Sequence, residues 1–154
     1  MADLIAKKAS RHRIVVGVDG SEGSKAALRW AITQAQLSGS TIDAVSAWQD
    51  PTQTGYMYGY ITTAAEDESY AEITQKILEA TVSEIRAEFD QPVEIQTHVL
   101  SGYPALLLPH AARDADLLVV GSRGHGAFAG MLLGSVSQHC VQHPTCPVVV
   151  IPHT

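Results

Sequence analysis

The chain carries little positive charge. Its 154 residues include 10 Lys and Arg against 16 Asp and Glu, which gives a formal net charge of −6. Proteins that bind nucleic acids gain most of their affinity from basic faces that release counterions. The few basic residues are scattered, apart from one cluster at Lys7, Lys8, Arg11 and Arg13. The charge balance therefore argues against a nucleic-acid-binding protein.

Long apolar runs and cysteines are also scarce. The strongest apolar runs, PALLLP and PVVVIP, are bounded by prolines and fall far short of the roughly 20 residues that span a bilayer. The opening MADLIAKKASRHR is not followed by the apolar stretch of a secretory signal. We therefore expect a cytoplasmic protein that does not contact membranes. In a reducing cytosol we expect Cys140 and Cys146 to be free thiols, although the two are able to pair in principle.

Short apolar runs alternate with longer segments of helical periodicity. Five runs predict strands, at residues 13–19, 41–48, 93–100, 116–122 and 146–152. Four segments predict helices, at residues 21–38, 70–89, 104–113 and 134–143. Alternation of this kind builds repeated βαβ units. We therefore predict an N-terminal tail at residues 1–12 and a single α/β domain at 13–154, with a parallel sheet and helices on both faces.

Two of the five runs look like edge strands. The third run alternates apolar with polar residues, as strands with one covered face do. The fifth run, Val148, Val149, Val150 and Ile151, is apolar throughout, yet the last strand should also end at an edge. Because a bare apolar edge strand invites pairing with another chain, we predict that a second subunit covers it. The segment from Gln49 to Ser69 lacks periodicity and fits a lid, a partner surface or a plain surface loop.

A glycine-rich segment follows the fourth run. Gly121 makes the turn, Gly124 follows after two residues, and nine residues later Gly134 and Ser135 open the next helix. Glycine lets a ligand approach the backbone, and a helix N-terminus offers free N–H groups to phosphate. Nine residues reach roughly 30 Å when extended, which is enough to wrap a triphosphate. We therefore predict a phosphate-binding loop. Further polar side chains in or after this loop belong to Arg123, His125 and Ser137.

An acidic residue follows the first run. Asp19 comes after Gly17 and Val18 and precedes the turn into the next helix. In open parallel sheets, ligands bind at the C-terminal ends of the strands where the strand order reverses, commonly the first and the fourth. Asp19 is therefore a candidate acceptor for a ribose. The alternative is that Asp19 only caps the following helix together with Ser21.

Several other motifs are absent or incomplete. No Gly-x-x-x-x-Gly-Lys-Ser/Thr sequence occurs, which excludes a Walker-type NTPase, and no Gly-x-Ser-x-Gly elbow indicates acyl transfer. The glycines at 124, 126 and 130 imitate a dinucleotide fingerprint. They follow the fourth run instead of the first, however, and lack an acidic residue about 20 positions further on. We therefore do not expect a nicotinamide or flavin site.

Four residues near the C-terminus resemble zinc ligands: His139, Cys140, His143 and Cys146. The two histidines share a helix face at the i, i+4 spacing, but Cys140 is rotated away from them. Structural zinc sites prefer paired Cys-x2–4-Cys loops. We favour a helix C-terminus that carries histidines and runs into a cysteine at the start of a buried strand.

The spacing Gly121-x2-Gly124-x9-Gly134-Ser135 resembles the ATP-binding branch of the universal stress protein family. The opening VVGVDGSEGSKAALRWA and the ending CPVVVI extend the match over nearly the whole chain. The resemblance implies a Rossmann-like open parallel sheet of five strands in the order 3-2-1-4-5. It also implies homodimers that pair through the last strand, and ATP, with or without Mg²⁺, bound between strands 1 and 4.

The resemblance also implies a role for individual residues. Asp19 would contact the ribose, and the backbone of Gly17 and Val18 would lie beside the adenine. Ala47 would recognise adenine through main-chain groups, so Ser46, where the family often has His, should not affect recognition. The residues that would line the phosphates are Gly121, Arg123, Gly124, His125, Gly134, Ser135, Val136 and Ser137.

The patterns, together with what the resemblance implies, lead to three functions from different classes. The leading one is a binding module and not an enzyme: a homodimer that holds ATP and whose occupancy changes its shape or partners under stress. The loop supplies phosphate donors but no obvious base that would activate water. The alternatives are a slow ATPase, in which Asp19 holds Mg²⁺ or orients water, and an ATP-independent scaffold or chaperone-like dimer.

Overall fold

Strands and helices alternate in the computed structural model, which describes residues 12–49, 64–124, 130 and 132–152. The strands are β1 (Arg13–Gly17), β2 (Thr41–Trp48), β3 (Ile95–Ser101), β4 (Leu117–Gly121) and β5 (Val148–Ile151). The helices are α2 (Glu22–Ser38), α4 (Ala64–Arg86), α5 (Pro104–Ala111) and α6 (Ser135–Gln142). The strands form one parallel sheet in the order β3-β2-β1-β4-β5, which confirms the predicted Rossmann-like α/β fold.

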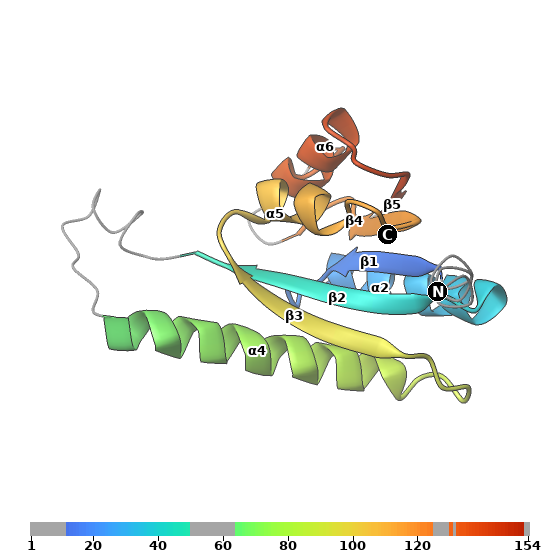
Figure 1. The fold of residues 1–154 in the computed structure, drawn as a ribbon, viewed down its shortest axis with the longest axis horizontal. Helices are drawn as coiled ribbons and strands as arrows, with labels where there is room; N and C mark the ends of the chain where they lie inside the picture. The colour runs from blue at the N-terminus through green and yellow to red at the C-terminus, as the bar shows by residue number, and fades with distance from the viewer. Residues whose placement is uncertain (1–11, 50–63, 125–129, 131, 153–154) are drawn as a thin grey trace, which may run out of the picture.

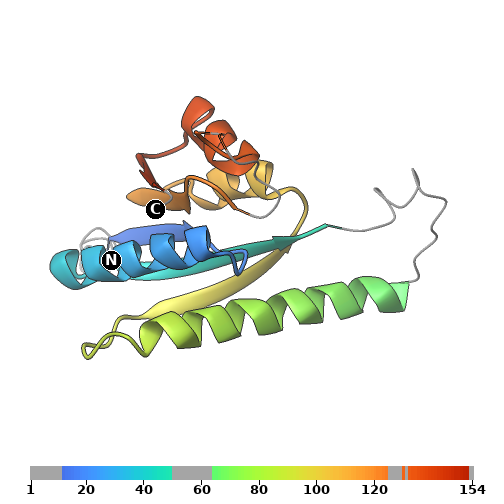
Figure 2. The same cartoon turned by 180° about the vertical axis from the view of Figure 1, so that it is seen from behind.

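Helices cover both faces of this sheet. Figure 1 shows α5 and α6 on one side and α4 on the other, and the reverse view in Figure 2 brings α2 to the front. One core lies between the sheet and the helices α2 and α4, and a second lies between the sheet and the helices α5 and α6. The central strands β1 and β4 are buried on both faces, with Val15, Val16 and Val119 fully inaccessible. Their nearly continuous Val, Ile and Leu content is typical of such strands.

The two predicted edge strands lie at the edges. Along β3, half-buried residues alternate with exposed ones, as its sequence pattern indicates. All four residues of β5 are only half-buried in the single chain although they are Val and Ile. The apolar surface of β5 is therefore available to another chain.

Helix α4 starts earlier than its apolar periodicity predicts. It begins at Ala64 and not at Tyr70, so the end of the aperiodic segment is helical. The sequence AAEDES at 64–69 consists mostly of Ala and Glu, which favour helices, and acidic residues stabilise a helix N-terminus. It has no large apolar residue that would mark one helix face. Residues 50–63, the rest of the proposed lid or surface loop, lie outside the described residues.

No helix in the described parts of the chain is long and apolar enough to cross a membrane.

Asp116 anchors the start of β1. Its Oδ2 accepts a hydrogen bond from the Arg13 backbone N–H at 2.8 Å, and its Oδ1 lies 3.3 Å from Nδ1 of His12. The bond from the Arg13 backbone, followed by the contact with His12, lowers the pKa of Asp116 below its ordinary value. The ionised carboxylate is therefore favoured in the folded chain.

We expect Asp116→Asn, which keeps an acceptor oxygen but removes the charge, to lower the free energy of unfolding at pH 7 by about 0.5–1 kcal/mol. This value is reduced because the side chain is half exposed and solvent screens it. A lowered folded pKa contributes stability above the unfolded pKa, near 3.9, and that stability is lost as the pH falls through the folded pKa. Urea unfolding should therefore show that the difference in unfolding free energy between the wild type and Asp116→Asn is smaller at about pH 3 than at pH 7. Asp90→Asn, at an exposed position, is the control. A difference that grows in acid would contradict this account.

Candidate functional site

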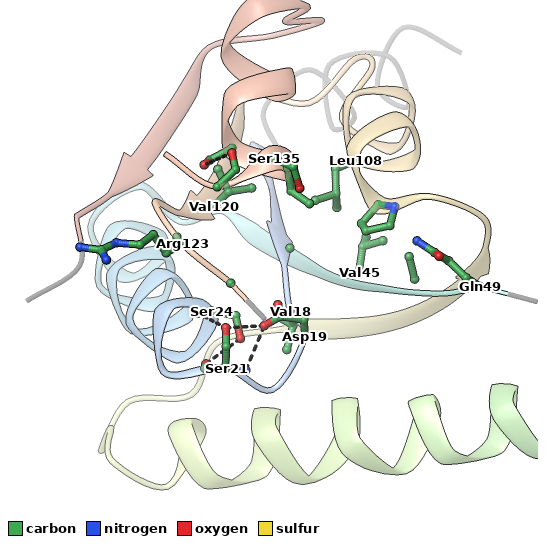
Figure 3. A pocket seen from close by; sticks show the side chains of 18 residues that line it. Val18, Asp19, Ser21, Ser24, Val45, Gln49, Leu108, Val120, Arg123 and Ser135 are labelled. Atoms are coloured by element: carbon green, nitrogen blue, oxygen red, sulfur yellow. Dashed lines mark hydrogen bonds between the residues drawn. The ribbon is translucent and has the colours of Figure 1, made fainter. Parts of the chain in front are cut away.

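A cleft of about 540 Å³ opens at the C-terminal ends of β1, β2 and β4 (Figure 3). Every predicted site residue that the structure describes lines it, namely Gly17, Val18, Asp19, Ala47, Gly121, Arg123, Gly124, Gly134, Ser135, Val136 and Ser137. The remaining one, His125, lies outside the described residues. The lining residues that sequence reasoning missed are Ser21, Ser24, Val45, Gln49, Pro104, Leu108 and Val120.

The turn from β1 into α2 forms one side of the cleft. Ser21 donates hydrogen bonds to Oδ1 of Asp19 from its backbone N–H, at 2.9 Å, and from its hydroxyl. Ser21 is also the N-cap of α2, where its Oγ accepts from the Ser24 N–H at 3.2 Å. Gly20, with φ of +82°, adopts the left-handed conformation that this turn requires. Asp19 therefore stabilises the start of α2 together with Ser21, as the capping alternative predicts, and it also lines the cleft.

Asp19 faces the loop after β4. A Cβ on Gly124 would lie only 2.6 Å from Oδ2 of Asp19, so a side chain at position 124 would displace this carboxylate oxygen. The Asp19 carboxylate and the start of the loop therefore lie at the same part of the cleft.

The first backbone N–H groups of helix α6 form another side of the cleft, across from the β1–α2 turn. The first turn of a helix has N–H groups without intrahelical acceptors. Here they belong to Ser135, Val136 and Ser137, because the Gln138 N–H is bonded to the Gly134 carbonyl at 2.9 Å. The N-terminal end of a helix also carries partial positive charge. The arrangement suits a bound anion.

Two predicted phosphate donors are used inside the protein instead. The Gly134 N–H donates to the Ser122 carbonyl at 2.6 Å. The buried hydroxyl of Ser137 lies 2.8 Å from the same carbonyl and 3.1 Å from that of Gly134, so its single proton is directed to these oxygens. Both groups hold the two ends of the loop together, so neither donor is directed at the cleft, although both residues line it.

The side chain of Arg123 does not enter the cleft. Figure 3 shows its guanidinium directed away from the cavity, and its buried Nε has no hydrogen-bond partner in the described structure. The Arg123 carbonyl lies against Gly23 in the first turn of α2, where a Cβ would collide with it. Only the Arg123 segment lines the cleft, so its predicted role as a phosphate cation is not supported.

The structure explains the glycine at position 121 by a contact different from the predicted approach of a ligand. A Cβ at this position would lie 2.7 Å from the carbonyl oxygen of Gly23 and 2.8 Å from its carbonyl carbon. Glycine is therefore required for the contact between β4 and α2, and not primarily for the approach of a ligand.

The end of β2 forms a third side of the cleft, which combines open backbone groups with apolar side chains. The β1–β2 ladder ends at the pair Gly17 and Val45, with the Val18 N–H bonded to the Val45 carbonyl at 2.9 Å. Backbone groups alternate between the two neighbours of a strand, so those of Ala47 point to the same side as those of Val45. They lie past the end of β1 and face the cleft. Apolar side chains surround this edge: Val18, Val45, Pro104, Leu108, Val120 and Val136.

The four residues that resemble zinc ligands do not form such a cluster. The rings of His139 and His143 lie 4.5 Å apart, but in the described part of the chain no group of three or more His, Cys, Asp or Glu is placed to hold a metal ion. Cys140 and Cys146 are free, and burial raises the pKa of the Cys140 thiol to about 11. Cys140 is thus a neutral core residue.

A parallel sheet of this order, with a polar and partly apolar cleft at the point where the strand order reverses, defines a Rossmann-like α/β protein of the nucleotide-binding type. The chain belongs to the universal stress protein family, whose model matches residues 10–152. A universal stress protein of Mycolicibacterium smegmatis is 34% identical over 142 residues, which cover 92% of this chain and 46% of that protein. The chain thus spans about half the length of the curated relatives that it matches.

Solved structures resemble more than nine tenths of the chain. The hypothetical protein MJ0577 has a TM-score of 0.76 at 18% sequence identity. The match covers 94% of this chain and 98% of that protein, and at this identity it shows a similar fold only. A universal stress protein in complex with cAMP has a TM-score of 0.65 at 26% identity, with 94% and 99% covered. The Archaeoglobus fulgidus universal stress protein in complex with dAMP has a TM-score of 0.64 at 27% identity, with 91% and 97% covered.

Gly121 and Gly134, at the two ends of the loop, should behave differently when a methyl group is added. We expect Gly121→Ala to lower the free energy of unfolding by about 3 kcal/mol, because the new Cβ meets the Gly23 backbone, which cannot move aside cheaply. Gly134→Ala should cost less than about 1 kcal/mol, the usual penalty of Ala at an N-cap, since its nearest neighbours are 3.5 Å away. Urea unfolding of the two variants measures this, and equal stabilities would contradict the assigned contact.

Proposed function

We propose that this chain is an ATP-binding regulatory module that works as a homodimer and is not an enzyme. The observation that carries the proposal is the division of the cleft into three chemically distinct sides. A carboxylate stands at the end of β1, helix N–H donors stand at the start of α6, and an apolar wall with exposed backbone groups stands at the end of β2.

These three sides match the three parts of a nucleotide. The Asp19 carboxylate accepts hydrogen bonds from ribose hydroxyls. The N–H groups of Ser135, Val136 and Ser137 donate to phosphate oxygens. The base lies against the apolar wall, and the backbone of Ala47 offers its edge one donor and one acceptor.

The related structures support a nucleotide with an adenine base. Both cAMP and dAMP, the ligands of two universal stress proteins of similar fold, carry adenine. The choice of a triphosphate rests on the length of the loop between Gly124 and Gly134, which contains nine residues. The cytoplasmic location expected from the sequence stays a prediction.

Binding without efficient hydrolysis is favoured by the scarcity of acidic groups. Asp19 is the only carboxylate among the described residues that line the cleft. Phosphoryl transfer to water needs a positioned nucleophile and, in most enzymes, a metal held by protein ligands. One carboxylate, already bonded to Ser21, is a poor basis for both tasks.

Asp19→Asn should lower the affinity for ATP about tenfold, the typical effect of losing a charged hydrogen-bond acceptor. Asn keeps an oxygen for the Ser21 N–H and so preserves the turn. Titration calorimetry on the wild type, on Asp19→Asn and on the distant Asp90→Asn measures the effect. Chromatography of denatured, freshly purified wild-type protein identifies any carried nucleotide.

Intact ATP after long incubation agrees with a binding module. Turnover that Asp19→Asn abolishes would instead favour the slow ATPase. The absence of any ATP binding by the wild type would favour the nucleotide-independent scaffold and would contradict the proposal.

The homodimer is proposed to form through β5. The Pro147 carbonyl accepts a hydrogen bond from the Leu118 N–H in β4 at 2.9 Å, and the Ile151 carbonyl accepts one from the N–H of Ser122, just after β4, at 2.8 Å. By alternation, the backbone groups of Val148 and Val150 point outward, away from β4. A second β5 strand would satisfy these groups and bury the half-exposed apolar side chains of both copies.

Val150→Pro should therefore convert the dimer into a monomer with an intact fold. Proline removes the outward N–H of residue 150 but no bond to β4, and edge strands tolerate it. Sedimentation velocity measures the state of association, with Val150→Ala as the matched control, which should stay dimeric. A dimer that survives Val150→Pro would show that the subunits pair elsewhere.

A further inference from the structure

The Arg123 side chain has a buried donor without an acceptor in the single chain. Its Nε is shielded from water and has no hydrogen-bond partner in the described structure, and none of the described ion pairs includes Arg123. Buried polar groups of native proteins are nearly always hydrogen-bonded, so an unpaired arginine nitrogen needs an explanation. The guanidinium is directed away from the cleft (Figure 3), so a ligand in the cleft does not supply the acceptor.

Arg123 stands beside the end of the edge strand β5. The N–H of Ser122, the residue before it, donates to the Ile151 carbonyl at 2.8 Å, and the Arg123 carbonyl lies against Gly23 in α2. Pro152 follows Ile151 and is exposed. The long arginine side chain therefore starts next to the strand that is proposed to pair with a second copy of the chain.

The β5 strands alone make a small interface. Each copy contributes four residues of β5, whereas stable protein interfaces have roughly 20–30 residues on each side. Contacts beside the strand are therefore needed for a stable dimer. Arginine is one of the residue types that most often carry binding energy at interfaces.

Symmetry fixes the direction in which two β5 strands pair. Two copies related by a two-fold axis present the same edge to each other. Only an antiparallel ladder is unchanged when its two strands are exchanged, because the bonds of a parallel ladder are slanted and differ between the two strands. The end of β5 in one copy therefore lies beside the start of β5 in the other.

Pro152 leaves a gap in this antiparallel ladder. Val148 and Val150 carry outward-pointing backbone groups, and by alternation those of residue 152 also point toward the second copy. Proline has no N–H, so the residue opposite Pro152 keeps a carbonyl oxygen without a donor from the ladder. When Val148 of one copy lies opposite Val150 of the other, that residue is Cys146 of the partner subunit.

We propose that the Arg123 guanidinium donates a hydrogen bond across the subunit interface to the carbonyl oxygen opposite Pro152. The inference rests on the proposed homodimer through β5 and adds to it a residue outside that strand. Arg123 follows β4, so the carbonyl lies two strand spacings away, roughly 9–10 Å. An extended arginine side chain and one hydrogen bond span this distance. Two-fold symmetry forms the contact twice in each dimer.

The test is sedimentation equilibrium of the full chain and three variants. Arg123→Met keeps a long side chain but removes every donor, so the Kd of the dimer should rise about tenfold or more, since the lost contact occurs twice. Arg123→Lys keeps one cationic donor and should raise the Kd less. Arg113→Met, at an exposed position after α5, is the matched control and should leave the Kd unchanged.

Urea unfolding of Arg123→Met in the monomeric Val150→Pro background separates an interface role from a structural role. In that background Arg123→Met should not lower the free energy of unfolding, because the buried Nε has no partner within its own chain in the described structure. A clear loss of stability there would show that Arg123 serves the fold of its own chain, and the proposed contact would be wrong.

The remaining outcomes separate this inference from the function on which it rests. If the wild type dimerises, Val150→Pro abolishes the dimer and Arg123→Met keeps the wild-type Kd, the role of Arg123 is wrong and the dimer through β5 stands. If the wild type is monomeric, both are wrong. Titration calorimetry with ATP gives a further check, since weaker ATP binding by Arg123→Met with an unchanged dimer Kd would assign Arg123 to the phosphates and overturn the proposal.

Discussion

The contact between the first turn of α2 and the end of β4 is the constraint on which the cleft depends. Gly121 and Gly23 meet backbone to backbone, and the Arg123 carbonyl lies against Gly23. A side chain at either glycine would push the helix away from the strand. Because the two segments touch, Asp19 at the head of α2 comes opposite Gly124 in the loop after β4. The carboxylate and the loop, more than 100 residues apart in the chain, thereby form one site.

Hydrogen bonds join the two described ends of the loop after β4. The Ser122 carbonyl accepts from the Gly134 N–H and from the Ser137 hydroxyl, which joins both ends of the loop. These groups are lost as ligand donors, but they fix the start of α6 and the direction of its N–H groups. A site that is already organised before its ligand arrives loses less conformational freedom on binding. In the proposed function, the Gly134 N–H and the Ser137 hydroxyl would therefore act indirectly, by placing the backbone N–H groups of Ser135, Val136 and Ser137.

The unequal lengths of β1 and β2 divide the cleft. β1 ends at Gly17, while β2 continues for three residues beyond Val45, its partner there, to Trp48. The extra length leaves strand backbone open to the cavity on an apolar wall, and it carries Gln49 to the rim. The charged and polar groups gather at the ends of β1 and β4 instead. A ligand with an aromatic part and an anionic part fits this division, and membership of the universal stress protein family agrees with it.

The sequence by itself determined the order of strands and helices, the burial of β1 and β4, the exposed edges, and the glycine, serine and aspartate positions that line the cleft. These are local signals, since periodicity and turn residues act within a few positions of the chain. It misplaced the start of α4, whose first six residues carry helix propensity without an apolar stripe. Only the tertiary structure decided that Arg123 turns away, that Gly121 meets α2, and that Gln49 and Leu108 join the site. Each of these depends on which distant segment lies across from the residue, and a one-dimensional pattern does not contain that contact.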